Sequence, residues 1–243
     1  MEPAFESIQT REPSLSERTA EQISRLIVER RLTCEDKLPS EFELAEMLGV
    51  GRGSIREGVK LLVARNVLEI RRGKGTYIAP NPGEVPDPLG FIYYPNQFQL
   101  ALDLAEIRLQ MEPWVARMAA ERAQEGDLKK LRETCSAVEQ DILAEREHSR
   151  SDVAFHVAIA ECTHNLVVPK LIPIITHAIT LFVSLTESRL RMETLVDHRE
   201  LLDAICSRDG ERAADTMTRH IQYNRTLMQG IGGESKNTPS EGE

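Results

Sequence analysis

The chain has 243 residues, with 30 Lys and Arg against 39 Asp and Glu, and a net charge of −9 at pH 7. This length suits one large domain or two modest ones, and a hydrophobic content of 41% is ordinary for a soluble protein. No apolar run looks long enough to span a membrane and no signal peptide is evident, so we expect a cytoplasmic protein. The four cysteines lack zinc or redox spacing and are expected to be reduced, packed thiols.

The N-terminal part predicts a helix preceded by an unstructured arm. Residues 1–13 show little pattern and are expected to form a loose arm. Ser14 or Ser16 is a suitable N-cap, and Glu17 lies in the first turn that would follow. The apolar residues beyond them should pack against the next two helices.

Those two helices are predicted to be joined by a tight turn. Residues 41–48 place apolar side chains at helical spacing, and the Gly49-Val50-Gly51 stretch allows the sharp turn that follows. The second helix is predicted to start near Arg52. Its buried side carries an apolar stripe, while Arg52, Ser54 and Arg56 cluster at its exposed N-terminal end.

A basic hairpin follows the second helix. Two short β-prone runs, residues 67–70 and 76–78, are joined by Arg71-Arg72-Gly73-Lys74-Gly75. A helix-turn-helix followed by such a wing is typical of DNA-binding domains, in which the second helix enters the major groove. Residues 50–79 carry seven Lys or Arg and two Glu, a local charge of +5, which leaves −14 for the rest of the chain. This distribution favours a DNA-binding head over a merely solvated basic face.

Within this head, six residues are candidate DNA contacts. Arg52 and Arg56 are expected to contact bases or phosphates, and Ser54 is expected to contact phosphate. In the wing, Arg72 and Gly73 should form the tip that contacts DNA, and Thr76 should contact a phosphate of the DNA backbone. One head offers little contact area, so we expect a homodimer that binds double-stranded DNA at an inverted repeat.

The remaining chain predicts a linker and an all-α bundle, so the fold class is mainly α, with a winged helix-turn-helix domain over residues 14–80. Prolines and glycines in residues 81–97 indicate a linker. Residues 98–230 are expected to form the helical ligand-binding domain, and the polar residues 231–243 a disordered tail. Pro113 should kink or split the first bundle helix. Helices are predicted over residues 98–122, 127–146, 152–162, 166–190, 194–207 and 210–228.

A candidate metal site lies in this bundle. Asp152 and His156 are four residues apart on one predicted helix and therefore face the same way, among apolar neighbours. An inward-facing aspartate is costly unless it is paired or binds a cation. His198 and His220 lie on two later helices. One carboxylate and three imidazoles suit zinc, with manganese or nickel as alternatives. From the residues alone, a surface ion pair or hydrogen-bonded core residues remain open.

The motifs together resemble the GntR family of bacterial transcription regulators. They are Leu38-Pro39-Ser40-Glu41, Leu44-Ala45, Gly49-Val50-Gly51-Arg52, Arg56-Glu57-Gly58 and Gly73-Lys74-Gly75-Thr76. Three residues depart from the family pattern: Phe42, Gly51 and Gly53 stand where relatives often carry arginine, serine and threonine.

The second half of the chain resembles the ligand-binding domain of the FadR subfamily. That resemblance implies a metal held by Asp152, His156, His198 and His220. It also implies an effector-binding Arg108, and Asn165 could add a polar contact. A surface ion pair between Arg108 and Glu112 is the alternative. Three other histidines are not expected to bind the metal. His148 is expected on the surface, His164 as a helix-end cap or a group near the ligands, and His177 as a core or surface residue.

Three functions are compatible with these features. The first is a DNA-binding transcriptional regulator, a repressor, controlled by a small carboxylate effector such as a hydroxy acid or sugar acid. The second is a metal-dependent hydrolase fused to a DNA-binding head, although no catalytic-base motif is evident. The third is an architectural DNA-binding protein with a structural metal. Effector-sensitive DNA binding would distinguish the first, and turnover of a bound acid the second.

Overall fold

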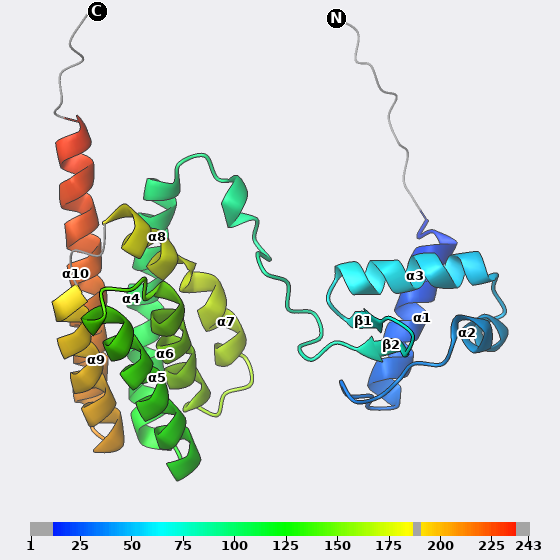
Figure 1. Ribbon diagram of the computed structural model, residues 1–243, viewed down its shortest axis with the longest axis horizontal. Helices are drawn as coiled ribbons and strands as arrows, with labels where there is room; N and C mark the ends of the chain where they lie inside the picture. Colours follow the sequence, from blue (N-terminus) through cyan, green and yellow to red (C-terminus); the bar gives the residue numbers. More distant parts are fainter. Residues whose placement is uncertain (1–11, 187–190, 237–243) are drawn as a thin grey trace, which may run out of the picture. The chain divides into compact units, whose positions relative to one another are not determined.

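The computed structural model describes residues 12–186 and 191–236 (Figure 1). These residues form two compact units, one ending at Pro88 and one beginning at Leu89. The first unit contains three helices and a two-stranded sheet. Its elements are α1 (Leu15–Glu29), α2 (Glu41–Leu48), α3 (Arg52–Ala64), β1 (Leu68–Arg71) and β2 (Gly75–Ile78).

Local hydrogen bonds define where the first two helices begin and end. Ser14 caps α1 through a reciprocal pair of hydrogen bonds with Glu17, as one of the two expected caps. Ser40 and Glu43 form the same arrangement at the start of α2. Gly49 ends α2 with a φ of +64°, a left-handed conformation that glycine adopts without strain. The tight turn predicted from the glycines is confirmed.

The core of this unit forms where α1 packs on α3. Ile23 of α1 and Ile55 and Leu62 of α3 are at most 1% exposed. Gly58 makes the close approach possible, since a Cβ there would lie 3.0 Å from Thr19 Cγ2. The apolar stripe predicted for the second helix therefore faces α1, and the opposite side of α3 stays available to solvent.

The hairpin pairs β1 and β2 in antiparallel register, from Leu68 opposite Ile78 to Arg71 opposite Gly75. Gly73 at its tip has a φ of +73°. The strands differ by one residue from the expected runs at the turn, because Arg71 and Gly75 still pair. The winged helix-turn-helix is confirmed.

The second unit is all helical. It begins inside the stretch expected to be linker, with a 3-10 turn, η1 (Phe91–Tyr93), whose buried Phe91 packs with Leu100 and Leu104. The bundle helices are α4 (Gln97–Arg122), α5 (Glu125–Leu143), α6 (Ser149–Glu161), α7 (Val168–Ile175), α8 (His177–Leu185), α9 (Arg191–Cys206) and α10 (Gly210–Lys236).

Beyond shifts of a few residues at helix ends, three features of the helices differ from expectation. Pro113 does not split α4, which is continuous around it. The single helix expected over residues 166–190 is two helices within the described residues, α7 and α8, which are divided at Thr176. The helix expected over residues 210–228 continues to Lys236. Most of the predicted N-terminal arm (residues 1–11), the end of the helix predicted over residues 166–190 (residues 187–190) and the end of the predicted tail (residues 237–243) lie outside the described residues.

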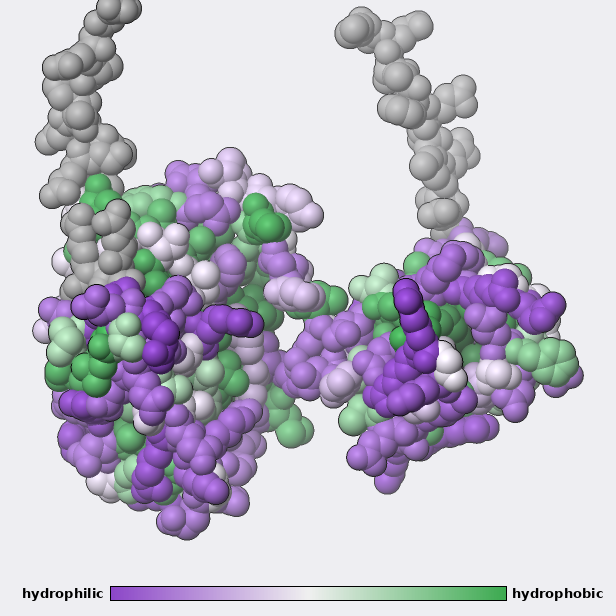
Figure 2. Space-filling model, in the orientation of Figure 1, coloured by the Kyte–Doolittle hydropathy of each residue, from purple (hydrophilic) through white to green (hydrophobic). Residues whose placement is uncertain are grey.

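The bundle core gathers α4, α5, α6, α9 and α10 around residues such as Ala116, Leu131, Phe155 and Ile205, none of which is exposed. Contrary to the sequence expectation, residues 168–185 are apolar enough by composition to span a membrane, with a mean hydropathy of 1.7. The structure divides this stretch at Thr176 and buries 44% of it within the bundle. Hydrophilic residues cover most of each unit on the face that Figure 2 shows.

Candidate functional site

The predicted DNA contacts lie on the surface of the first unit. Arg52, in the first turn of α3, is exposed, and Ser54 is half-buried. Arg72 and Gly73 are exposed at the wing tip, and Thr76 is half-buried on β2. Arg72, Gly73 and Thr76 also line a groove of about 330 Å³ between the wing and the start of α2.

Arg56 differs from Arg52, because its side chain is already engaged. Its Nε donates to Glu41 Oε2 of α2 at 2.7 Å, while 61% of the Arg56 side chain remains exposed. Among the described residues, Arg52 forms no ion pair. The two arginines of the expected recognition helix are therefore not equivalent, since only Arg52 is free of an intramolecular carboxylate.

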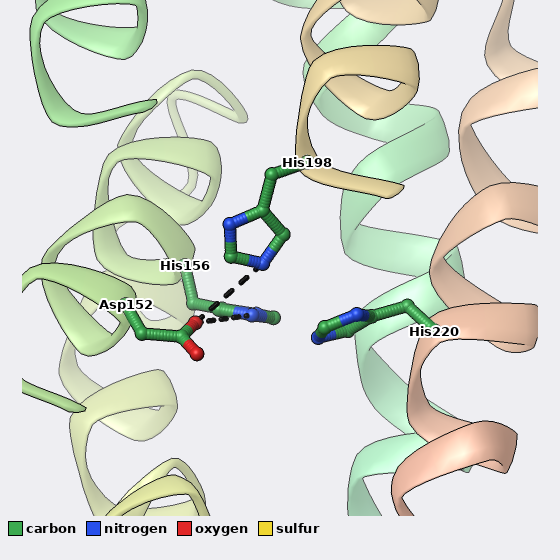
Figure 3. Close-up of side chains that lie close together, drawn as sticks. All are labelled: Asp152, His156, His198 and His220. Carbon is green, nitrogen blue, oxygen red and sulfur yellow. Dashed lines mark ion pairs between the residues drawn. The ribbon is translucent and has the colours of Figure 1, made fainter. Parts of the chain in front are cut away.

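The four predicted metal ligands come together inside the bundle. Asp152 and His156 lie one turn apart on α6, His198 lies on α9, and His220 lies on α10. Each is at most 4% exposed, and one ligand atom from each lies within 4.8 Å of the others. Figure 3 shows the carboxylate and the three imidazole rings turned toward one another.

The spacing of these atoms fits a metal ion. Asp152 Oδ1 lies 3.3 Å from His156 Nε2 and 3.5 Å from His198 Nε2. Ligand atoms about 2.0–2.2 Å from a tetrahedral zinc ion would lie roughly 3.3–3.6 Å apart. The imidazole rings of His198 and His220 also lie close together, with their centroids 4.9 Å apart.

The oxygen and nitrogen atoms that would bind a metal lack hydrogen-bond partners within the described residues. They are Asp152 Oδ1, His156 Nε2, His198 Nδ1 and Nε2, and His220 Nε2. Buried polar atoms are nearly always satisfied, because leaving one without a partner costs about 1–3 kcal/mol. A divalent cation bound between these residues would satisfy the atoms that lie close together, so the residues fit a divalent metal.

Two further carboxylates lie beside the other ring nitrogens of His156 and His220, and neither was predicted from the sequence. Glu112 of α4 accepts from His156 Nδ1. Asp197 Oδ2 lies 3.7 Å from His220 Nδ1. Carboxylates behind metal-binding histidines fix the tautomer and the ring orientation. The sequence signal was weak, because Glu112 looked only like an i+4 partner of Arg108 and Asp197 like one charge among many.

The acid–base properties of the cluster follow from its burial and charges. Burial would raise the pKa of Glu112, but the charges of Arg108 and His156 outweigh it and lower the pKa to about 2. The pKa of Asp152 is likewise lowered, because the nearby histidines outweigh its desolvation. Desolvation holds the pKa of His198 well below its usual value. The site therefore keeps two buried carboxylates ionised and favours a neutral His198.

The two predicted effector residues have different surroundings. Arg108 is 2% exposed, its Nε donates to Glu112 Oε1 at 2.5 Å, and its buried Nη2 has no hydrogen-bond partner among the residues that the structure describes. The ion pair considered as an alternative thus exists, but it is buried rather than on the surface. Asn165 is not among the four clustered residues: its Oδ1 accepts from the backbone N–H groups of Val167 and Val168 at the start of α7. The effector contact expected of Asn165 stays a prediction.

The three histidines left out of the site have other surroundings. The expectation that His148 lies on the surface is wrong, since it is 3% exposed at the start of α6. His164 pairs with Asp127 through Nε2 at 2.8 Å. The ring of His177 lies 5.8 Å from that of Phe91.

Comparison with known proteins identifies the family. The description "Bacterial regulatory proteins, gntR family" matches residues 15–78, and "FCD domain" matches residues 103–223. The chain is 31% identical over 229 residues to the Escherichia coli protein named "Putative L-lactate dehydrogenase operon regulatory protein", covering 88% of this chain and 86% of that protein. The chain belongs to the gntR family of bacterial regulatory proteins. It is a DNA-binding transcriptional regulator and not an enzyme, which removes the fused hydrolase as an interpretation.

Other relatives agree with this assignment. The "Uxu operon transcriptional regulator" of Escherichia coli is 31% identical, with 82% of this chain and 81% of that protein covered. The "Galactonate operon transcriptional repressor" of the same species is 29% identical, over 80% of this chain and 90% of the relative. A solved structure described as "Streptococcus agalactiae GntR" is 37% identical with a TM-score of 0.75, over 87% of this chain and 99% of that chain.

Proposed function

We propose that this gntR-family protein is a cytoplasmic repressor that binds an inverted-repeat operator as a homodimer and responds to a small hydroxy acid or sugar acid bound at a metal in the bundle. The observation that carries the proposal is the set of unpartnered donor atoms on Asp152, His156, His198 and His220. These residues would hold a divalent ion, zinc in first place, with manganese or nickel as alternatives.

In the head, the exposed side of α3 and the wing supply the DNA contacts. Arg52 is free to reach a base edge, whereas Arg56, paired with Glu41, is better suited to a phosphate. Ser54 and Thr76 would bind DNA phosphates. Arg72 and Gly73, at the tip of the wing, would enter or border a groove of the DNA. Two heads related by a two-fold axis would double this small contact area and require an inverted repeat.

The charge of the bundle site favours an anionic effector. A divalent ion and Asp152 leave a net positive charge, because metal-bound histidines are neutral. Arg108 adds a buried guanidinium whose Nη2 has no hydrogen-bond partner among the described residues, so a carboxylate could pair with it and also bind the ion. A 2-hydroxy acid offers two oxygens for chelation. Two relatives are named for an L-lactate dehydrogenase operon and a galactonate operon, and both names refer to hydroxy acids.

Calorimetry with a panel of hydroxy acids and sugar acids, on native and metal-stripped protein, tests the proposal. We expect one acid to bind only the metal-loaded protein and to release it from operator DNA in a gel-shift assay. Binding of a neutral or cationic ligand without metal would contradict the proposal. Operator binding that no acid alters would favour an architectural protein with a structural metal.

A further inference from the structure

Glu112 is not one of the proposed metal ligands, yet it lies between one of them and the proposed effector anchor. It comes from α4, the helix that follows the linker in sequence, and it is 2% exposed. Its Oε2 contacts His156 Nδ1, and its Oε1 accepts from Arg108 Nε at 2.5 Å. One buried carboxylate therefore joins a residue of α6 to a residue of α4.

The contact with His156 determines which ring nitrogen can bind a metal. A neutral imidazole that binds a metal through Nε2 must carry its proton on Nδ1. Glu112 accepts that proton's hydrogen bond and so holds Nε2, the unpartnered atom, toward Asp152. Without Glu112, the ring could bind either way or rotate.

The three histidines are supported unequally. His156 has a buried carboxylate in direct contact, whereas His220 has Asp197 at 3.7 Å, and Asp197 also accepts from Arg219 at 2.8 Å. His198 has no hydrogen-bond partner on either nitrogen within the described part of the chain, and its ring packs against Phe155 with centroids 4.5 Å apart. The most strongly oriented ligand is thus His156.

We propose that Glu112 is a positioning residue that orients His156 for metal binding and ties that ligand to Arg108, so that the metal and a carboxylate at Arg108 influence each other's affinity. This inference rests on the metal site of the proposed function. A carboxylate that pairs with Arg108 Nη2 would hold the guanidinium in place beside Glu112, so that Glu112 stays ionised and aligned with His156 Nδ1. The imidazole would then stay oriented for the metal. By linkage, the metal raises carboxylate affinity by the same factor.

The proposal predicts that substitutions at Arg108 also affect metal binding. Arg108→Ala would leave Glu112 buried without its counter-ion, so it should weaken the metal as well as the effector. Arg108→Lys keeps a positive charge near Glu112, but its ammonium lacks the planar guanidinium that could pair with both Glu112 and the effector carboxylate. It should therefore retain more metal affinity than Arg108→Ala.

The test is Zn²⁺ affinity of the full chain, measured by competition with a chromophoric chelator. Glu112→Gln keeps the size and an acceptor oxygen but removes the charge, and we expect a loss of about 10- to 100-fold in affinity. Glu106→Gln is the matched control: it removes a carboxylate from the same helix, but that side chain is 65% exposed and pairs loosely with Arg225 at 3.7 Å. It should leave Zn²⁺ affinity unchanged. Asp197→Asn should lose less than Glu112→Gln, because its contact is longer.

A second measurement separates orientation from simple space filling. In NMR spectra of the Zn²⁺-loaded wild type, the His156 ring should show a proton on Nδ1 and a metal on Nε2. Glu112→Gln should weaken or mix this state even where the thermal transition of the metal-free protein is unchanged. Wild-type affinity in Glu112→Gln, or metal on His156 Nδ1, would overturn the proposal while leaving the metal site intact. A wild type that binds no Zn²⁺, Mn²⁺ or Ni²⁺ would instead reject the proposed function.

Discussion

In the head, Arg52 and Arg72 lie on the surface, whereas in the bundle Asp152, His156 and His198 are at most 4% exposed. Exposed cations are solvated by water until DNA replaces it, so they cost the fold little. Buried donors without partners are costly until an ion satisfies them. The head can therefore lose function without losing stability, whereas in the bundle function and stability should change together.

The largest effect should come from removing the metal. At a free metal concentration a thousandfold above Kd, binding stabilises the folded bundle by about 4 kcal/mol, and a chelator or His198→Ala should abolish this gain. Trp114 is the only tryptophan and lies on α4, so its fluorescence reports bundle unfolding selectively. His164→Ala, which removes an exposed ion-paired histidine, is the control. Equal metal content in His198→Ala and the wild type would contradict the assignment of His198.

A change at Arg52 should have the opposite character. Arg52→Ala should weaken specific operator binding by about 1–3 kcal/mol and leave thermal stability unchanged, because this side chain is exposed and forms no ion pair among the described residues. Arg65→Ala, at the other end of α3, is the matched control and should bind normally. Gel-shift titrations at fixed salt measure both. If Arg52→Ala bound its operator as the wild type does, α3 would not be the recognition helix.

Alkaline pH should weaken the bundle more than the head. Burial raises the pKa of the Cys135 thiol to about 11 and that of Cys162 to about 12. The unfolded thiol loses its proton near pH 8.5, so this stabilisation is complete below that pH and is lost as pH rises toward 11, on the order of 1 kcal/mol per pH unit for each thiol. In denaturant titrations from pH 8 to 10, the free energy of unfolding should fall less steeply with pH for Cys135→Ala than for the wild type.

The exposed Cys34 should react with a thiol reagent before the buried Cys135 and Cys162 do.

The smallest effects concern two glycines at the start of α3. Gly51 is the N-cap, with φ −68° and ψ 148°, but it offers no side-chain oxygen. Gly51→Ser should stabilise the head by a few tenths of a kcal/mol. Gly53→Ala should add up to about 1 kcal/mol, since a Cβ there meets nothing within 4 Å. Thermal melts of the full chain measure both changes. A loss of stability in either variant would show that these glycines serve the fold.

The sequence by itself determined most of the head, because its structure depends on local interactions. The caps at Ser14 and Ser40 join residues three apart, and Gly49 ends its helix through its own backbone preference. Asp152 and His156 also followed from sequence, since residues four apart share a helix face. The family motifs then extended the set to His198 and His220, which the fold does bring together.

Only the tertiary structure decided what surrounds these residues. Glu112 and His156 are 44 residues apart, and no local pattern predicts that their helices place them in contact. The burial of Arg108 and His148, the hydrogen bonds of Asn165 at the start of α7, and the break at Thr176 likewise depend on which surfaces pack together. Periodicity tells which face of a helix is buried, whereas the neighbour across that face is set by the packing of the whole bundle.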